Sequence, residues 1–366
     1  MVRENLWKIY DEKHLEELER VNKQYRECLD AGKTERECVR ETIRLAKEAG
    51  YRDMKELRKN KESVKAGDKV YMDYMGRAII LFQAGTQPIE NGMNILGAHI
   101  DSPRIDIKQN PLYEEQEVAY LDTHYYGGVK KYQWVAMPLA IHGVVIRKDG
   151  TKTDIVIGEK DDEPGFIITD LLPHLGRKQM EQNADKFIDG EKMDLVIGNR
   201  PLKGEEKDAV KAEMLRLFHD YYGIEEEDFL SAELEIVPAG KAKECGLDRS
   251  MIMAYGQDDR VCAFTSLMAM LAEKEVERTS CCILIDKEEI GSVGASGATS
   301  RFFENTVAEL IALMGEYNEL TLRRALANSK MLSSDVSAAY DPMFEEAYEK
   351  KNCAYFAHGP VFNKYT

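Results

Sequence analysis

The first residues that could do chemistry are His99 and Asp101, which follow the apolar run Ile95-Leu96 and precede Pro103. The run predicts a buried strand, and side chains repeat every second residue along a strand, so both polar groups can lean toward one face. A carboxylate in that place can fix the tautomer of an imidazole that binds a metal ion. Considered alone, the segment is equally consistent with a histidine satisfied by local hydrogen bonds at a strand end.

Carboxylates stand in three later segments as well. Asp258 and Asp259 come where a loop enters a predicted helix, and on their own they could simply cap its N-terminus. Glu288 and Glu289 follow the apolar run 283–285 and precede a glycine-rich turn. Adjacent side chains at a strand end point to different places, so one can bind a metal ion while the other acts as a general base. A solvated acidic turn is the alternative for this pair. Asp335 follows a fourth short run.

Most of these groups stand at the end of a predicted strand, and open α/β sheets bind ligands beyond the carboxyl ends of their strands. Together they supply one imidazole and several carboxylates, which are the donors that a two-metal hydrolase centre needs. Such a centre holds its ions about 3.5–4 Å apart and shares one carboxylate between them. Asp258 is the natural bridge.

The hydrophobic periodicity indicates the elements that must position these groups. Two amphipathic helices are predicted in the first fifty residues, with a capping box at Thr34 and Glu37. The other predicted elements are a hairpin over 69–83, a helix over 260–275, a strand over 280–285, a long helix over 301–327 and a terminal strand within 354–366. This alternation predicts an α/β fold with helices on a mixed sheet.

Residues 104–240 differ from the segments on either side because they are rich in predicted strands, among them a hairpin around Lys148-Asp149-Gly150. We therefore predict two domains. A discontinuous α/β domain comprises residues 1–103 and 241–366, and a β-rich domain of residues 104–240 is inserted into it.

Composition narrows the class of protein. The 366 residues are 43% hydrophobic, which excludes wholesale disorder, and no apolar run is long enough to span a bilayer. A formal net charge of −16 argues against binding to nucleic acid or to an anionic membrane. The seven cysteines include no Cys-x-x-Cys pair, and the first residues carry no secretion signal. We therefore expect a cytoplasmic protein with reduced thiols.

At this point the order of the motifs resembles the aspartyl aminopeptidase family of metallo-aminopeptidases over essentially the whole chain. Four motifs carry the resemblance, namely Gly97–Pro103, Asp258–Arg260, Asp286–Ser292 and Ser333–Asp335. Thr123–Gly128 and Leu172–Leu175 support it. The resemblance implies a mixed-sheet dinuclear-metal peptidase domain whose inserted β-rich domain serves for dimerisation. It also implies that the dimers assemble into a dodecamer that encloses the active sites.

The resemblance implies a role for each matching residue. His99 and Asp335 would bind one metal ion, Glu289 the other, and Asp258 both. Asp101 would orient His99, and Glu288 would activate the attacking water. Zinc is the family's usual ion, and Mn²⁺ or Co²⁺ can serve in relatives.

Three further histidines need separate treatment. His174 is the candidate for a histidine of the inserted domain that reaches a neighbouring subunit's active site, although a plain surface histidine fits it equally well. For His124 and His142 a structural role is expected.

The chain also departs from the family pattern. In relatives the fold continues beyond the equivalent of Thr366, and the continuation carries a terminal histidine ligand of the second metal ion. His358 matches a segment that is not the ligand. We therefore expect an incomplete second metal site and a protein that binds one ion, with little peptidase activity.

Three functions remain open at this stage. The first is a metal-dependent aminopeptidase that removes N-terminal residues from peptides, with Glu288 as general base. The second is an amidohydrolase or deacylase built on the same two-metal plan. The third, from a different class, is an assembly protein whose catalytic centre is silent.

Overall fold

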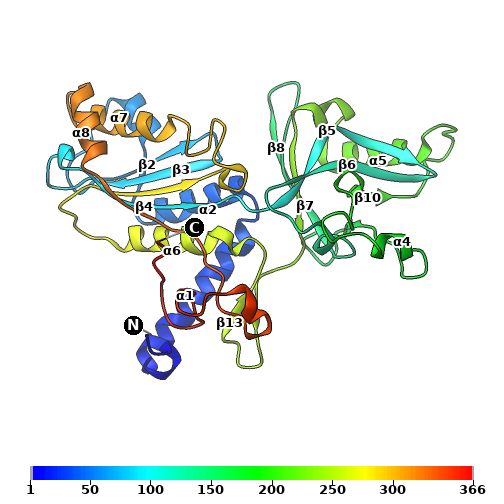
Figure 1. Ribbon diagram of the computed structural model, residues 1–366. Coiled ribbons are helices and arrows are strands. Elements are labelled where there is room, and N and C mark those ends of the chain that lie inside the picture. Colours follow the sequence, from blue (N-terminus) through cyan, green and yellow to red (C-terminus); the bar gives the residue numbers. More distant parts are fainter. Residues whose placement is uncertain (1–2, 365–366) are drawn as a thin grey trace.

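Two β-sheets organise the chain, and each has its own hydrophobic core (Figure 1). The computed structural model describes residues 3–364. We call the six-stranded sheet with helices α1–α3 and α6–α8 the first lobe. The seven-stranded sheet, built entirely from residues between 104 and 238, forms the second lobe with α4 and α5. The division of the lobes follows the change in sequence pattern after Pro103. The exact domain boundaries and a role in dimerisation stay predictions.

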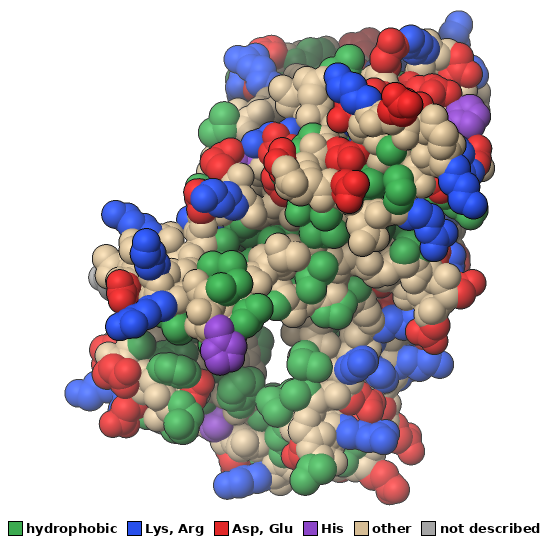
Figure 2. All heavy atoms as spheres, turned by 90° about the vertical axis from the view of Figure 1, so that its right-hand side faces the viewer, with side chains coloured by type: hydrophobic (Ala, Val, Ile, Leu, Met, Phe, Trp, Pro, Cys, Tyr) green, Lys and Arg blue, Asp and Glu red, His purple; other side chains and the backbone are tan. Residues whose placement is uncertain are grey.

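The second lobe is an antiparallel sheet with one face packed on a helix. Its strands, in their order across the sheet, are β8 (Lys152–Ile157), β7 (Leu139–Ile146), β11 (Glu233–Pro238), β5 (Arg104–Glu115), β6 (Val118–Tyr126), β10 (Leu195–Gly198) and β9 (Ile167–Ile168). Helix α5 (Ala209–Tyr222) buries Val210 and Met214 against this sheet, and α4 (Arg177–Met180) is a single exposed turn. Figure 2 shows that apolar side chains lie among charges of both signs on this side of the molecule.

The first lobe has three layers, with helices on both faces of its sheet. The strands, in order, are β1 (Arg52–Asp53), β2 (Lys69–Tyr74), β3 (Ala78–Gln83), β14 (Ser280–Ile285), β4 (Asn94–His99) and β15 (Lys330–Ser333). The helices are α1 (Glu12–Ala31), α2 (Glu35–Glu48), α3 (Met54–Asn60), α6 (Gln257–Ala272), α7 (Phe302–Met314) and α8 (Glu319–Ala327). A separate two-stranded ribbon joins β12 (Lys243–Cys245) and β13 (Met251–Met253).

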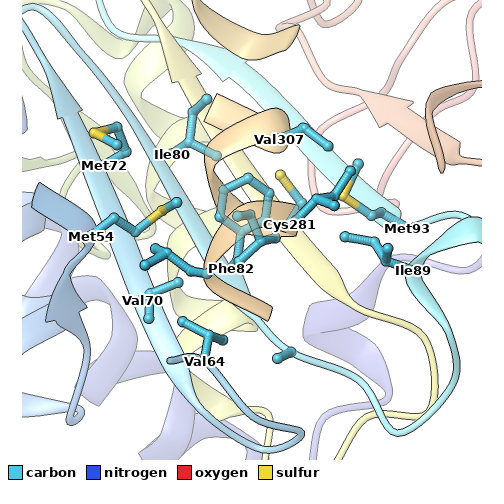
Figure 3. Close-up of a cluster of buried hydrophobic side chains, with 14 of the residues drawn as sticks. Met54, Val64, Val70, Met72, Ile80, Phe82, Ile89, Met93, Cys281 and Val307 are labelled. Atoms are coloured by element: carbon cyan, nitrogen blue, oxygen red, sulfur yellow. The ribbon is translucent and has the colours of Figure 1, made fainter. Parts of the chain in front are cut away.

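Strand alternation distributes the side chains of β3 between the two faces. Ile80 and Phe82 pack with α3 and α7, whereas Ile79 and Leu81 pack with α2 and α6. Figure 3 shows the first of these clusters, in which Met54, Phe82 and Val307 converge between the sheet and the helices. Because every residue of β3 is buried, the strand reads as a continuous apolar run.

Several predicted elements are confirmed. The hairpin over 69–83 is β2 and β3, joined by the turn Met75–Arg77. The capping box at Thr34 and Glu37 is present at the start of α2. Strands β14 and β7–β8 match the predicted strand over 280–285 and the predicted hairpin around Lys148.

Two predicted elements are wrong. The long helix over 301–327 is two helices, because α7 ends at Gly315 and the side chain of Asn318 starts α8 by accepting the Thr321 N–H. The terminal strand is not formed in the described part of 354–366; an isolated bridge between Ala339 and Ala354 is the only pairing there. Pro360 has no N–H with which to pair.

None of the helices within residues 3–364 has both the length and the apolar character needed to cross a bilayer.

A buried ionic cluster joins the two lobes. The imidazole of His142, on β7, contacts Glu37 of α2 through Nδ1 at 2.9 Å and Glu159 through Nε2 at 3.0 Å. Lys33, in the turn before α2, donates to Glu159 at 2.5 Å and to the carbonyl oxygens of Pro238 and Gly240. Burial opposes the charge on His142, but its hydrogen bonds with Glu159 and Glu37 outweigh burial and raise the pKa of His142 above 6.5. His142 therefore has a structural role.

We predict that His142→Gln lowers the free energy of unfolding by about 3 kcal/mol near pH 6, since removing one partner from a buried ion pair leaves the other charges unpaired. A raised histidine pKa gives stability that is complete below 6.5 and is lost as the pH rises through the folded-state value. Burial opposes ionisation of Glu37 and Glu159 too, but their hydrogen bonds with His142 lower both pKa values, and this contribution disappears as the pH falls below about 4.5. Denaturant titrations at several pH values should show the largest difference between these limits.

The matched control is His219→Gln, because His219 pairs with Glu225 on the exposed surface, where an ion pair contributes little. A destabilisation by His142→Gln that is the same at pH 6 and pH 9 would contradict the assignment.

Candidate metal centre

The carboxyl ends of three parallel strands meet at one edge of the first lobe's sheet. His99 ends β4 and is opposite Ile285 of β14 in the register, and β15 pairs with β4 on its other side. The predicted glutamates follow β14 in a 3₁₀ turn, Glu288–Ile290. Asp335 follows β15. The helix α6 adds Asp258 from its first turn, so the four elements bring residues from distant parts of the chain together.

His99 is the centre of this arrangement. Its side chain is buried, and its Nε2 lies 3.3 Å from Asp258 Oδ1 and 3.8 Å from Glu288 Oε2. Two groups of three residues could each hold an ion, because the donor atoms of each group lie within 4.8 Å of one another. One group is His99, Asp258 and Glu289, and the other is His99, Asp259 and Asp335. The four residues predicted as metal ligands thus all belong to groups that share His99.

Asp101 contacts both His99 and the turn that carries the two glutamates. The side chain is completely buried, and its two carboxylate oxygens accept the backbone N–H groups of Glu288 at 3.1 Å and Glu289 at 3.2 Å. Oδ1 also lies 3.3 Å from His99 Nδ1, and Oδ2 accepts the Tyr126 hydroxyl at 2.7 Å. Burial opposes ionisation, but these bonds prevail and lower the pKa of Asp101. Asp101 therefore fixes both the imidazole and the backbone of the glutamate turn.

The remaining carboxylates are crowded. Burial, with the neighbouring charge of Asp258, raises the pKa of Glu289 to about 7. Burial raises the pKa of Asp259 to about 7 as well. Burial also disfavours a charged His99, but hydrogen bonds with Asp101 and Asp258 overcome it and raise the pKa of His99 to about 11. Ionisation of Glu289 and Asp259 is thus unfavourable in the protein alone, and a bound cation would make it favourable.

Asp259 belongs to one of the two donor groups, although it was not among the predicted metal ligands. It is completely buried, and neither of its carboxylate oxygens has a hydrogen-bond partner among residues 3–364. Such an orphaned buried carboxylate is rare in proteins and needs an explanation, for example an ion. The adjacent pair Asp258-Asp259 was the available signal, but the sequence could not tell which of the two side chains turns inward.

The second lobe also touches this centre, through the end of the Thr123–Gly128 motif, for which no role at the metal site was predicted. Tyr126 reaches Asp101, and the next residue, Gly127, has a φ of +75°. A Cβ atom at Gly127 would lie 3.1 Å from Glu289 Oε2, so the backbone there passes directly against the side chain of Glu289. Only glycine allows both that conformation and that approach.

His174 is not brought to the group within this chain. It lies exposed in the loop between β9 and α4 of the second lobe. His124 is exposed as well and stacks on Tyr125. His358 contacts the carbonyl oxygen of Phe356 and belongs to neither donor set.

A cavity of about 280 Å³ adjoins the donor groups. His99, Glu288 and Asp335 line it together with the apolar side chains of Phe302 and Phe303. A small molecule in this cavity would have its polar end at the carboxylates and an apolar part between the two phenylalanines.

Comparison with known proteins agrees with this chemistry. A family model described as aminopeptidase I zinc metalloprotease (M18) matches residues 28–366. The "Probable M18 family aminopeptidase 1" of Clostridium acetobutylicum is 54% identical over 363 residues, which cover 99% of this chain and 78% of that protein. The crystal structure of an M18 family aminopeptidase from Thermotoga maritima is similar with a TM-score of 0.92 and 40% identity, covering 98% of this chain and 78% of that one.

A dodecameric Saccharomyces cerevisiae structure has a TM-score of 0.72 and 21% identity, covering 91% of this chain and 75% of that one, and this likeness concerns the fold alone. The predicted α/β class and the resemblance to metallo-aminopeptidases are both confirmed. The chain therefore belongs to the M18 family of aminopeptidase I zinc metalloproteases and is a metallo-aminopeptidase.

Proposed function

We propose that this chain removes N-terminal residues from peptides at the centre around His99, with zinc held by His99, Asp258, Glu289 and Asp335. The observation that carries the proposal is the convergence of these donor atoms in two groups within 4.8 Å. An imidazole with several carboxylates is a donor set that zinc accepts, and Mn²⁺ or Co²⁺ would accept it too. When bound, zinc supplies a Lewis acid that polarises a carbonyl group and makes a neighbouring water more acidic.

Two features of the described residues fit a cation here. The carboxylate of Asp259 is buried without a hydrogen-bond partner among residues 3–364. Burial raises the pKa values of Glu289 and Asp259, so a nearby positive charge would restore their ordinary ionisation. Both donor groups share His99, and its Nδ1 is turned to Asp101. One imidazole nitrogen therefore faces the carboxylates. His99 and Asp335 would hold one tightly bound ion, Glu289 would hold a weaker second one, and Asp258 would contribute to both.

Glu288 is the proposed general base. Its backbone is fixed by Asp101, while its side chain is 46% exposed on the open side of the centre. A carboxylate in this position can take a proton from the attacking water and deliver it to the leaving amine, because it is anchored at its backbone and free at its tip. Glu289, one residue on, turns into the donor group instead.

We also propose that the chain self-associates as dimers that build a larger assembly, as the S. cerevisiae structure does with twelve copies. In support, the second lobe exposes a cluster of apolar side chains around His174, including Leu171, Leu172 and Leu175. Exposed apolar patches of this kind are typical of contacts between proteins. In such an assembly His174 would reach a neighbouring active site. A cytoplasmic location remains part of the proposal, supported by seven free cysteines.

Zinc binding gives the first test. Adding zinc to metal-free protein should raise its thermal midpoint by a few degrees, since a ligand at 100 times its Kd stabilises a protein by about 2.7 kcal/mol. His99→Ala should abolish this rise and weaken zinc binding by at least about 100-fold, as measured by competition with a chelator, because the nitrogen ligand is lost. His124→Ala, at an exposed histidine, should behave as the wild type. Wild-type zinc affinity in His99→Ala would refute the assignment.

Replacement of the general base gives the second test. Glu288→Gln should lower kcat for an aminoacyl p-nitroanilide by about 10²–10⁴-fold while zinc affinity stays within a few-fold of the wild type. The control Glu275→Gln changes an exposed glutamate after α6 and should leave kcat unchanged.

The same assay separates the other functions. A preference for N-acetylated substrates would favour an amidohydrolase or deacylase. Equal inactivity of the zinc-loaded wild type and Glu288→Gln would favour a silent assembly protein.

A further inference from the structure

We propose that Tyr126 is a positioning residue through which the second lobe holds the metal centre of the first. Its hydroxyl donates to Asp101 Oδ2 at 2.7 Å, and Asp101 in turn holds His99 and the turn that carries Glu288. The inference rests on the proposed metal centre. It adds that the inserted lobe is part of that centre and not only a surface for assembly.

The path of the chain explains how Tyr126 reaches this place. Strand β4 ends at His99, the chain crosses between the lobes at 100–103, and β5 begins at Arg104. The last residue of β6, Tyr126, is opposite Arg104 in the register of the second sheet. The β5–β6 hairpin therefore returns the chain, after more than twenty residues, to the crossing segment that contains Asp101.

A buried cation fixes the ring of Tyr126. The guanidinium of Arg104 lies 3.7 Å from the ring centre, close enough for a cation–π interaction. Arg104 is itself buried and donates from Nε to Asp106 at 2.7 Å, and its Nη2 lies 3.4 Å from Glu35 of the first lobe. With its charge held from two sides, Arg104 leaves the tyrosine little freedom to move its hydroxyl away from Asp101.

The hydroxyl matters because of what else Asp101 binds. The completely buried carboxylate accepts the N–H groups of Glu288 and Glu289 and the Tyr126 hydroxyl. Its Oδ1 also lies 3.3 Å from His99 Nδ1, which contacts the backbone carbonyl oxygen of Asp101 at 2.9 Å. Tyr126 is the one partner that comes from the second lobe. Without it, Oδ2 keeps a single donor, at 3.2 Å, and the carboxylate is held less firmly. The glutamate turn, which this carboxylate fixes through two N–H groups, and the imidazole that faces its Oδ1 would then be positioned less exactly.

Gly127 independently places the end of β6 against the metal centre. A Cβ at this position would meet both Glu289 Cβ and Glu289 Oε2 at 3.1 Å. Tyr126 thus acts on the glutamate turn through Asp101, and the Gly127 backbone lies directly against the Glu289 side chain. These two consecutive residues are the part of the second lobe that contacts the proposed metal centre.

The test is Tyr126→Phe, which removes only the hydroxyl and keeps the ring under Arg104. Zinc affinity, measured by competition with a chelator, should fall by about 10–100-fold, as is typical when an outer partner of a metal ligand is lost. The zinc-saturated variant should have kcat lowered by about 10-fold with KM within twofold of the wild type. The visible spectrum of the Co²⁺-substituted variant should also shift, while the thermal midpoint of the metal-free protein changes by no more than one or two degrees.

The matched control is Tyr125→Phe, at the neighbouring and more exposed ring, which should leave all four measurements unchanged. In a double-mutant cycle, Tyr126→Phe should add little to Asp101→Asn, because the hydroxyl acts through that carboxylate. Wild-type affinity and spectrum in Tyr126→Phe would overturn the positioning role and leave the metal centre intact. Unfolding of metal-free Tyr126→Phe would also overturn it, since the hydroxyl would then hold the fold. Absence of zinc binding by the wild type would overturn the proposed function as well.

Discussion

The buried carboxylate of Asp101 is the interaction on which the rest of the centre depends. A charge that is completely removed from water is tolerated only when donors surround it, and Asp101 has donors from three separate parts of the chain. His99 approaches from the end of β4, the glutamate turn from the end of β14, and Tyr126 from the second lobe. Because each of these groups satisfies the same anion, their relative positions are fixed together.

The contacts continue from Asp101 around a closed ring. Asp286, two residues before Glu288, accepts from Arg77 Nε at 2.9 Å and from Ser296 at 2.5 Å. Arg77 also pairs with Glu35 at the start of α2, and Glu35 faces Arg104, which lies over the ring of Tyr126. The ring returns from Tyr126 to Asp101. The glutamate turn is therefore held at its start twice, by the contacts of Asp286 before it and by Asp101 at the backbone of Glu288 and Glu289.

The features that could be predicted are those whose determining residues lie close together in the sequence. The polar groups around His99, Asp258, Glu288–Glu289 and Asp335 could be singled out because each follows an apolar run or enters a helix, and strand carboxyl ends meet at one edge of a sheet. The choice of His99, Asp258, Glu289 and Asp335 as ligands came from the family resemblance. The capping box at Thr34 and the β2–β3 hairpin were equally accessible, since their determinants lie within a few residues. The break in the predicted helix over 301–327 had a local signal in Gly315 and Asn318, but the apolar periodicity on both sides concealed it.

Other features depend on contacts between residues that are far apart in the sequence. Tyr126 reads as an ordinary strand residue, and only the pairing of β5 with β6 brings it back to the crossing segment. The inward turn of Asp259 likewise depends on how α6 is seated. Ser102 donates to the carbonyl oxygen of Asp258 at 2.7 Å, and Arg260 donates to the carbonyl oxygen of Lys33 at 2.8 Å. Contacts between residues so far apart in the sequence cannot be inferred from the spacing of motifs.

The charged character of the junction between the lobes has a physical consequence of its own. Apolar residues of similar volume would often stabilise such a junction at least as well, because burying ions costs desolvation energy. Apolar packing, however, tolerates small shifts, whereas a hydrogen-bonded ion pair is satisfied in one geometry. Arg104 of the second lobe faces Glu35 of the first, and Arg77 of the first lobe pairs with Glu233 of β11, so a rotation of the second lobe would leave buried charges unpaired. A centre that takes Asp101 from the crossing segment and Tyr126 from the far side of it needs that geometry held within a fraction of an ångström. The ionic junction is thus suited to orientation more than to stability, and through Arg104 and Tyr126 it adjoins the proposed metal centre.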